Sequence, residues 1–149
     1  MMYHYKDCGL RGVWLANGFR TISTDYGRAT AIENVEGLHR VIARTIAVEK
    51  PRLSDGEFRF LRKELGLTQT ALAEWFGNDS QTIALWERGR KRVPQWADRL
   101  IRQLVLETQG RNQRLLDLIE SLATKNDGTA ADRLVFEERP RKGWVSRAA

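Results

Sequence analysis

The stretch that decides the fold runs from Leu61 to Pro94 and reads LRKELGLTQTALAEWFGNDSQTIALWERGRKRVP. Its apolar residues recur at helical spacing in two short segments. Gly77, between the segments, can take the left-handed backbone conformation that ends a helix. A run of cations follows, from Arg88 to Arg92. The stretch therefore predicts two short helices around a tight turn, followed by a basic segment.

Residues that suit helix starts reinforce this prediction. Ser54 and Glu57 have the spacing of a capping box, which predicts a further helix that starts before the quoted stretch and ends at Gly66. Thr68 and Asp79 are good N-caps for the two helices inside it.

The second of these helices divides into an inward and an outward face. Ile83 and Trp86 are three positions apart and are expected to face inward. Their neighbours then face solvent near the helix N-terminus, the end that a recognition helix presents to base edges. Gln81 offers an amide that can pair with adenine, and Thr82 offers a hydroxyl and a methyl group. The residues expected to read bases are Ser80, Gln81, Thr82, Ala84 and Leu85.

The pattern GLTQTALAEWFG-x-x-S-x-T-I-x-x-W-E-x-G resembles the helix-turn-helix of the phage-repressor and Cro family, the XRE-like regulators. The resemblance covers Leu53 to roughly Thr108. It implies that Gln69 braces against a DNA phosphate and that the five residues named above are the base-reading positions. Leu85 departs from the family, which usually has a polar or basic residue there. A leucine cannot donate a hydrogen bond, so it either touches a thymine methyl or adds nothing to readout.

Cations just after the helix are placed to contact the phosphates that flank a groove. We expect phosphate contacts from Thr68, Gln69, Arg88, Arg90, Lys91 and Arg92. Glu87 is assigned to structure, because a carboxylate beside DNA would repel phosphate unless a neighbouring cation neutralised it.

The bulk composition fits this reading without deciding it. The chain has 149 residues, 25 Lys and Arg, 19 Asp and Glu, and a net charge of +6. Acidic and basic residues are nearly balanced over 53–109, so the basic character there is local to the segment after the recognition helix. Cys8 is the single cysteine, which excludes an internal disulfide. The N-terminus lacks the apolar core of a signal peptide and no segment resembles a membrane span, so we expect a cytoplasmic protein of a bacterial or phage nucleoid.

The residues before the predicted helix-turn-helix domain have the composition of a small α+β module, over 1–48. Asn17-Gly18 and Tyr26-Gly27 lie between β-forming residues and predict a three-stranded antiparallel meander. Helical spacing of apolar residues from Val35 to Ala47 predicts a helix that packs on this sheet. Residues 49–52, with Pro51, form the predicted linker to the helix-turn-helix domain over 53–109.

The residues after the predicted helix-turn-helix predict two further helices and then a C-terminal tail. Pro94 suits the first turn of a helix whose inward stripe is Trp96, Leu100, Ile101 and Leu104. Residues 110–124 predict an amphipathic helix that either folds back or pairs with a second subunit; paired half-sites on DNA favour the dimer. Residues 125–149 predict a mobile basic tail containing a short strand over 134–138. The fold class is therefore α+β: an N-terminal meander and helix, an all-α phage-repressor-like domain, and a C-terminal helix.

The N-terminus also resembles part of a zinc module. In MqsA-type antitoxin repressors such a module, built on paired CxxCG motifs, precedes an XRE-like helix-turn-helix. Here Tyr5 stands where the first cysteine of one motif would be, Cys8-Gly9 follows, and the second motif is absent. A structural zinc needs four ligands, whereas His4, Cys8 and His39 supply three at most. We therefore predict no metal and no other cofactor.

No set of residues has the spacing of a catalytic site, and we predict no enzyme. The sequence predicts a DNA-binding transcriptional regulator, an autoregulating repressor that binds a palindromic operator as a homodimer. The alternative is an antitoxin or adaptor that acts through a toxin or effector protein bound by residues 1–48. An RNA-binding protein is a third alternative; it would need exposed aromatic residues, whereas Trp75 and Trp86 are expected to pack inward.

Overall fold

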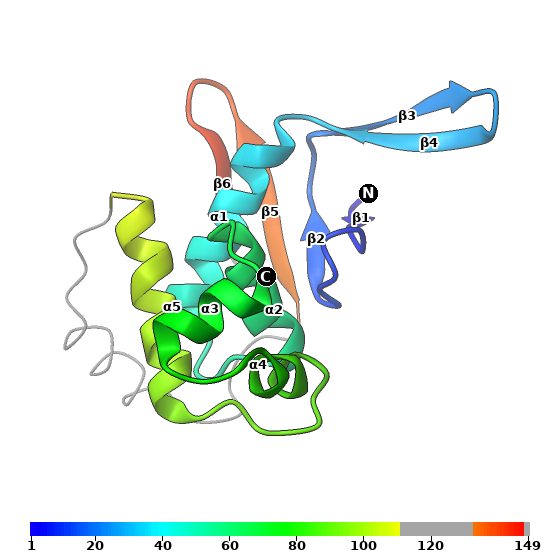
Figure 1. Ribbon diagram of the computed structural model, residues 1–149. Coiled ribbons are helices and arrows are strands. Elements are labelled where there is room, and N and C mark those ends of the chain that lie inside the picture. The colour runs from blue at the N-terminus through cyan, green and yellow to red at the C-terminus, as the bar shows by residue number, and fades with distance from the viewer. Residues whose placement is uncertain (111–132, 148–149) are drawn as a thin grey trace. The chain divides into compact units, whose positions relative to one another are not determined.

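A computed structural model describes residues 1–110 and 133–147 of the chain (Figure 1). Its elements are β1 (Tyr3–His4), β2 (Val13–Leu15), β3 (Phe19–Thr24), β4 (Gly27–Ile32), α1 (Val35–Glu49), α2 (Asp55–Glu64), α3 (Gln69–Phe76), α4 (Ser80–Glu87), α5 (Gln95–Thr108), β5 (Leu134–Arg139) and β6 (Gly143–Arg147). They confirm the predicted α+β class. The chain forms two compact units: a sheet unit, residues 1–42 with 131–149, and a helical unit, residues 43–130.

The sheet unit is assembled from segments far apart in the sequence. Its four-stranded sheet has the order β1-β2-β5-β6, in which β2 and β5 are parallel and the other neighbours antiparallel. In Figure 1 the orange β5 lies beside the blue β2. Buried apolar side chains from the strands and from the first half of α1 form the core of this unit: Val13, Leu15, Leu38, Ile42, Val135 and Phe136.

The expected three-stranded meander is wrong at its first turn, because β3 and β4 form a separate two-stranded sheet. Asn17 carries the chain from one sheet to the other. Its side-chain amide donates to the carbonyl of Glu138 (3.2 Å), and its Oδ1 accepts from the Glu138 backbone N–H (2.7 Å). Gly18 has a φ of 77°, and the Trp144 indole fills the space that a Cβ there would need. The Asn-Gly pair therefore anchors the end of β2 to β5 instead of closing a hairpin.

The predicted short strand over 134–138 is confirmed as part of β5, but the predicted mobile tail is wrong over the residues that the structure describes. β5 and β6 form a hairpin from Leu134 to Arg147. Trp144 is buried, and its indole N–H donates to the carbonyl of Glu33 (2.9 Å). The cations that suggested a solvated tail lie around the exposed turn, so they leave the strand pairing intact: Arg139, Arg141 and Lys142. The predicted helix over 110–124 lies outside the described residues, apart from Gly110.

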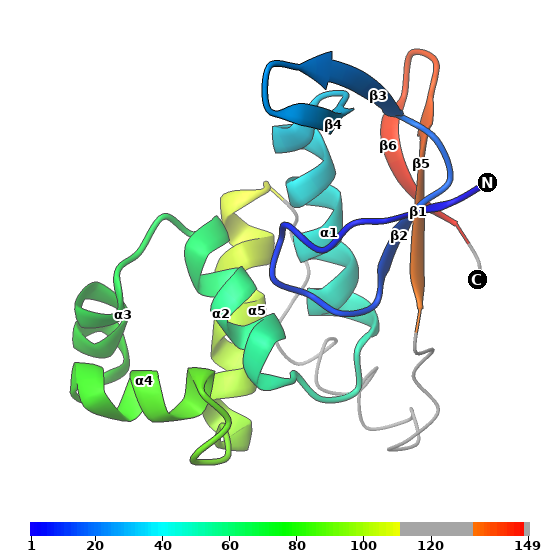
Figure 2. The same ribbon diagram turned by 90° about the vertical axis from the view of Figure 1, so that its right-hand side faces the viewer.

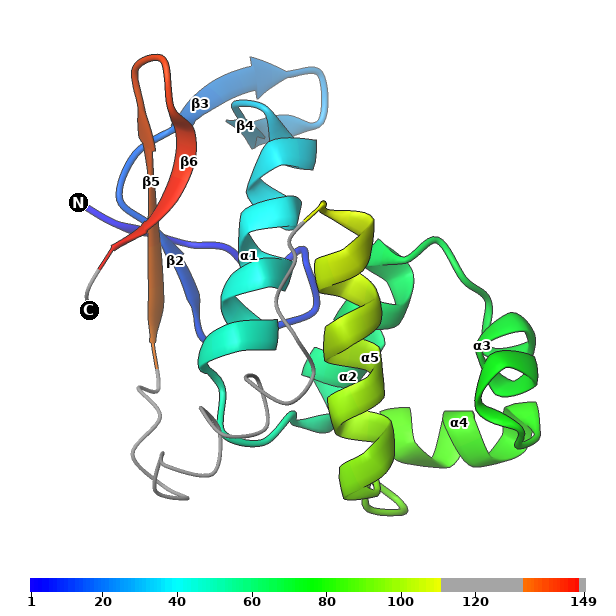
Figure 3. The ribbon, with the colours of Figure 1, turned by 90° about the vertical axis from the view of Figure 1, so that its left-hand side faces the viewer.

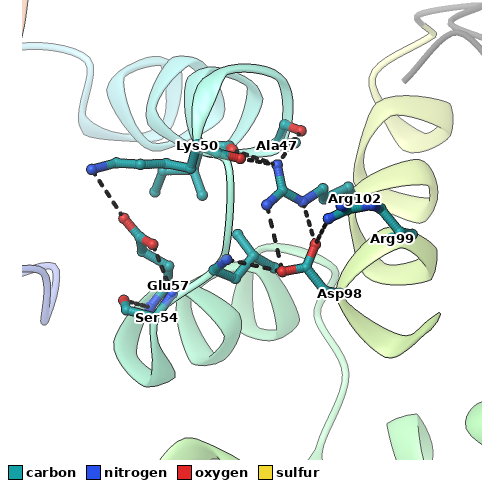
Figure 4. A network of polar contacts seen from close by, with 9 residues as sticks. Ala47, Lys50, Ser54, Glu57, Asp98, Arg99 and Arg102 are labelled. Atoms are coloured by element: carbon teal, nitrogen blue, oxygen red, sulfur yellow. Dashed lines mark hydrogen bonds and ion pairs between the residues drawn. The ribbon is translucent and has the colours of Figure 1, made fainter. Parts of the chain in front are cut away.

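The predicted linker over 49–52 does not separate the two units, because their boundary falls inside α1. Arg102 of α5 is fully buried and holds the end of α1 in the helical unit (Figure 4). Its Nη1 donates to the carbonyls of Ala47 (3.1 Å) and Lys50 (2.5 Å). The C-terminal carbonyls of a helix lack partners within the helix, so a buried guanidinium there satisfies them.

A buried carboxylate completes this network. Asp98 accepts from Arg102 Nε (2.7 Å) and from the backbone N–H of Leu53 (2.9 Å), just before α2. Residues 50–53 are thus fixed to α5 at both ends. The predicted inward stripe of α5 is right at Ile101 and wrong at Trp96, which is half exposed, and Leu100 and Leu104 are only partly buried. The buried side of α5 instead includes this ion pair: Ala97, Asp98, Ile101, Arg102, Val105 and Leu106.

Candidate nucleic-acid interface

The helix-turn-helix frame forms as its caps predict. Thr68 accepts from the backbone N–H of Ala71 (3.0 Å) at the start of α3, and Gly77 ends α3 with a φ of 74°. Asp79 then accepts from the backbone N–H of Thr82 (2.8 Å) at the start of α4. Hydrogen bonds from Thr82 hold the pKa of the Asp79 carboxyl below its usual value. Figure 2 shows the two short helices in succession.

The predicted inward face of α4 is confirmed. Ile83 and Trp86 are buried, as is Leu72 of α3. The Trp86 ring meets the ring of Phe58 of α2 edge to face, with centroids 5.6 Å apart. α5 packs beside α2 and closes this core (Figure 3). With two of its side chains buried here, α4 has one face left for solvent.

The structure brings the five expected base-reading residues onto the remaining surface of α4. Gln81 and Leu85, four positions apart, are exposed, and Leu85 keeps 38% of its surface. Ser80, Thr82 and Ala84 are partly exposed. None of the five carries a charge. The surface combines an amide, two hydroxyls and small or apolar groups, which suits contact with base edges and thymine methyls.

The carboxylate of Glu87 is neutralised by an unforeseen partner. Arg62 of α2 donates to both Glu87 oxygens, at 2.6 Å from Nε and 2.9 Å from Nη2, and a third bond runs to the carbonyl of Leu67 (2.8 Å). Bidentate pairs of this kind fix geometry as well as charge. Gln69 also donates to Glu87 (3.1 Å). The side chain predicted to brace a phosphate is therefore tied to the end of α4.

The basic segment after α4 is held in place by its backbone. The N–H groups of Arg90 and Lys91 both donate to the carbonyl of Leu85, at 3.0 and 3.2 Å. The four predicted phosphate-contacting cations of this segment are all exposed: Arg88, Arg90, Lys91 and Arg92. Within residues 1–110 and 133–147, none of them has an ion-pair partner. Their charges are available to an anionic ligand.

Two tryptophans of the helical unit are more exposed than expected. Trp75 keeps 59% of its surface and Trp96 keeps 49%, whereas Trp86 is buried. Trp75 lies outward because Leu72, Ala73 and Phe76 supply the packed side of α3. The sequence-based argument against RNA binding that relied on a buried Trp75 is therefore lost.

The candidate metal ligands of the N-terminus have separate contacts. The His4 ring stacks on Trp14 with centroids 4.2 Å apart, whereas His39 Nε2 lies 2.8 Å from the hydroxyl of Tyr5. Cys8 Sγ donates to the Tyr5 carbonyl (3.6 Å), and burial raises the pKa of its thiol. Over the described residues, no three His, Cys, Asp or Glu side chains are grouped to hold a metal ion.

No described helix is both long enough and apolar enough to span a bilayer. Comparison of the chain with protein-family models, curated proteins and solved structures finds no match.

Proposed function

We propose that the chain is a transcriptional regulator that binds specific duplex DNA sequences, with α4 in the major groove. The observation that carries this proposal is the separation of side-chain types along one segment. The exposed face of α4 is uncharged, and four exposed cations follow it directly, none of which has an ion-pair partner among the residues that the structure describes. Uncharged hydrogen-bonding groups suit base edges, whereas cations suit the phosphates beside the groove.

Neutralisation of Glu87 supports the same assignment. The side chains of Arg62 and Glu87 keep 9% and 3% of their surface, so this ion pair presents little charge to a ligand. Gln69, bonded to Glu87, is set at the start of α3, where helix N-termini favour a phosphate. Thr68 caps that same terminus.

The regulator acts, in this proposal, as a homodimer on a palindromic operator near its own gene, as an autoregulating repressor in the cytoplasm. Helix-turn-helix dimers bind half-sites about one helical turn apart, roughly 34 Å. Binding of a toxin or effector protein by residues 1–48 is a separate proposal. Co-purification of a small protein in stoichiometric amount would support it.

Fluorescence anisotropy with duplexes from the region upstream of the gene, and with scrambled duplexes of equal composition, tests base reading. Gln81→Ala should weaken binding to the upstream site by about 1–3 kcal/mol and relax the preference at one base pair. Gln95→Ala, which alters an exposed glutamine of α5, is the matched control and should change nothing. Equal losses on upstream and scrambled DNA would contradict the assignment of Gln81.

The same titration at several salt concentrations tests the phosphate contacts. Arg90→Ala should weaken binding to every sequence alike and reduce the slope of log K against log salt by about one unit. Arg59→Ala, which removes an exposed cation of α2, should leave the slope unchanged. A slope unaffected by Arg90→Ala would remove this residue from the phosphate contacts.

A further inference from the structure

The part of the β3–β4 hairpin nearest its turn is exposed to solvent. Every residue from Arg20 to Ala29 is exposed, Ile22 by 40% and Tyr26 at the turn completely. Figure 1 shows the hairpin extending away from the four-stranded sheet of the same unit. A two-stranded hairpin is marginally stable alone, and its outer edges offer unpaired backbone groups to another strand.

The hydrogen bonds between β3 and β4 indicate which backbone groups of the hairpin face away from the partner strand. The N–H of Glu33 donates to the carbonyl of Gly18 (2.8 Å), so the pair Gly18–Glu33 is hydrogen-bonded. Hydrogen-bonded pairs alternate along an antiparallel ladder. From the pairing register of β3 and β4, the residues of β3 whose backbone groups bond inward to β4 are Arg20, Ile22 and Thr24. The residues whose N–H and C=O groups face outward are Phe19, Thr21 and Ser23 on β3, and Arg28, Thr30 and Ile32 on β4.

These edges carry few of the features that normally prevent strand pairing. Natural edge strands are protected by proline, bulges, charged side chains or very short length. The hairpin has no proline, its register is continuous from Phe19–Ile32 to Thr24–Gly27, and each strand carries one arginine. β3 is the better pairing edge, because four of its six residues are β-branched or aromatic, whereas β4 contains a glycine and two alanines.

We propose that β3 pairs with β3 of a second copy of this chain, antiparallel, with Thr21 of one copy opposite Thr21 of the other. Such a twofold contact is self-complementary. The backbone N–H of each Thr21 donates to the C=O of the other Thr21, and Phe19 of one copy lies opposite Ser23 of the other. Arg20 lies opposite Ile22, so that its aliphatic stem covers the half-exposed isoleucine. No like charges face each other in this register.

The contact is small, so the dimer should be weak in the absence of another contact. Interfaces well below about 1,200 Å² are typical of transient complexes. The pairing needs no DNA, so it can hold or fail whether or not the proposed function is correct.

Sedimentation velocity of the full chain over a concentration series, without DNA, tests the pairing. Thr21→Pro removes an outward N–H from each copy, and the two lost hydrogen bonds should weaken the dimer by about thirtyfold. Thr30→Pro makes the same change on the outer edge of β4 and is the matched control. Edge strands tolerate proline where the N–H faces solvent, so both hairpins should persist. Dimer loss only in Thr21→Pro supports the proposal; equal effects, or loss only in Thr30→Pro, overturns it.

A crosslinking variant covers the case in which proline disturbs the hairpin. Hydrogen-bonded pairs in antiparallel sheets have Cα atoms about 5.5 Å apart, within the range of a disulfide. In a Cys8→Ser background, Thr21→Cys should give a covalent dimer on mild oxidation, whereas Thr30→Cys should stay monomeric. The reverse result, or no crosslink in either, overturns the proposal. So would a Thr21→Pro protein that loses DNA affinity with unchanged sedimentation, because the hairpin would then be a nucleic-acid contact.

Discussion

Replacing Arg102 with methionine tests whether the buried ion pair holds the helical unit together. The substitution keeps much of the side-chain volume but leaves the Asp98 carboxylate, on a residue that keeps only 3% of its surface, without its main cation. It also removes the donor from the carbonyls of Ala47 and Lys50. Breaking a buried pair by removing one partner costs about 3–5 kcal/mol. We expect a loss of that size in the free energy of unfolding of the helical unit.

Urea unfolding followed by far-ultraviolet circular dichroism measures this loss. Arg99→Met is the matched control, since Arg99 also contacts Asp98 (2.9 Å) but lies closer to the surface. Its removal should cost about 1 kcal/mol or less. Adding Asp98→Leu to Arg102→Met should recover part of the stability, because no isolated charge remains buried. A loss below about 1 kcal/mol for Arg102→Met would refute the reasoning, since a buried carboxylate that loses its main cation costs more than that.

Two further predictions concern the sheet unit. Burial lowers the pKa of His39 below 6.5, so its stabilising contribution should be complete above about pH 6.5 and decline as the pH falls through the lowered value. Thermal unfolding from about pH 8 to pH 5 should show this decline, and His39→Gln should reduce it. An identical decline in the variant would mean that a group other than His39 causes it. Gly18→Ala should cost about 1–3 kcal/mol by forcing a Cβ into the Trp144 indole at a positive φ. Gly9 has a similar φ and open space around it, so Gly9→Ala should lower the free energy of unfolding by less, as measured by denaturation. Equal losses would mean that the backbone conformation, and not the contact with Trp144, causes the effect at Gly18.

Local chemistry was enough to predict the helix starts and the inward face of α4 in the helical unit. The capping box at Ser54 forms with Glu57, and Thr68 and Asp79 cap their helices as expected. Each of these signals acts over three or four residues, so the sequence contains both partners of every contact. The inward position of Ile83 follows from helical spacing in the same way.

The errors concern contacts between residues far apart in the chain. Asn17-Gly18 has the local signature of a hairpin, but its hydrogen bonds run to Glu138, 121 positions away. The buried pair of Asp98 and Arg102 reads as a solvated i, i+4 ion pair, because its backbone partners lie outside its own helix. Helix and strand propensity and hydrophobic periodicity depend only on nearby residues. They therefore did not predict the four-stranded sheet or the buried charged side of α5.

The parallel pairing of β2 with β5 has a consequence for folding during synthesis. The ribosome completes residues 43–110, the described part of the helical unit, before it makes Leu134–Arg139. β2 therefore lacks its β5 partner until the described part of the helical unit has been synthesised. A nascent chain released before β5 would carry a folded DNA-binding candidate and an unfinished sheet with an open edge.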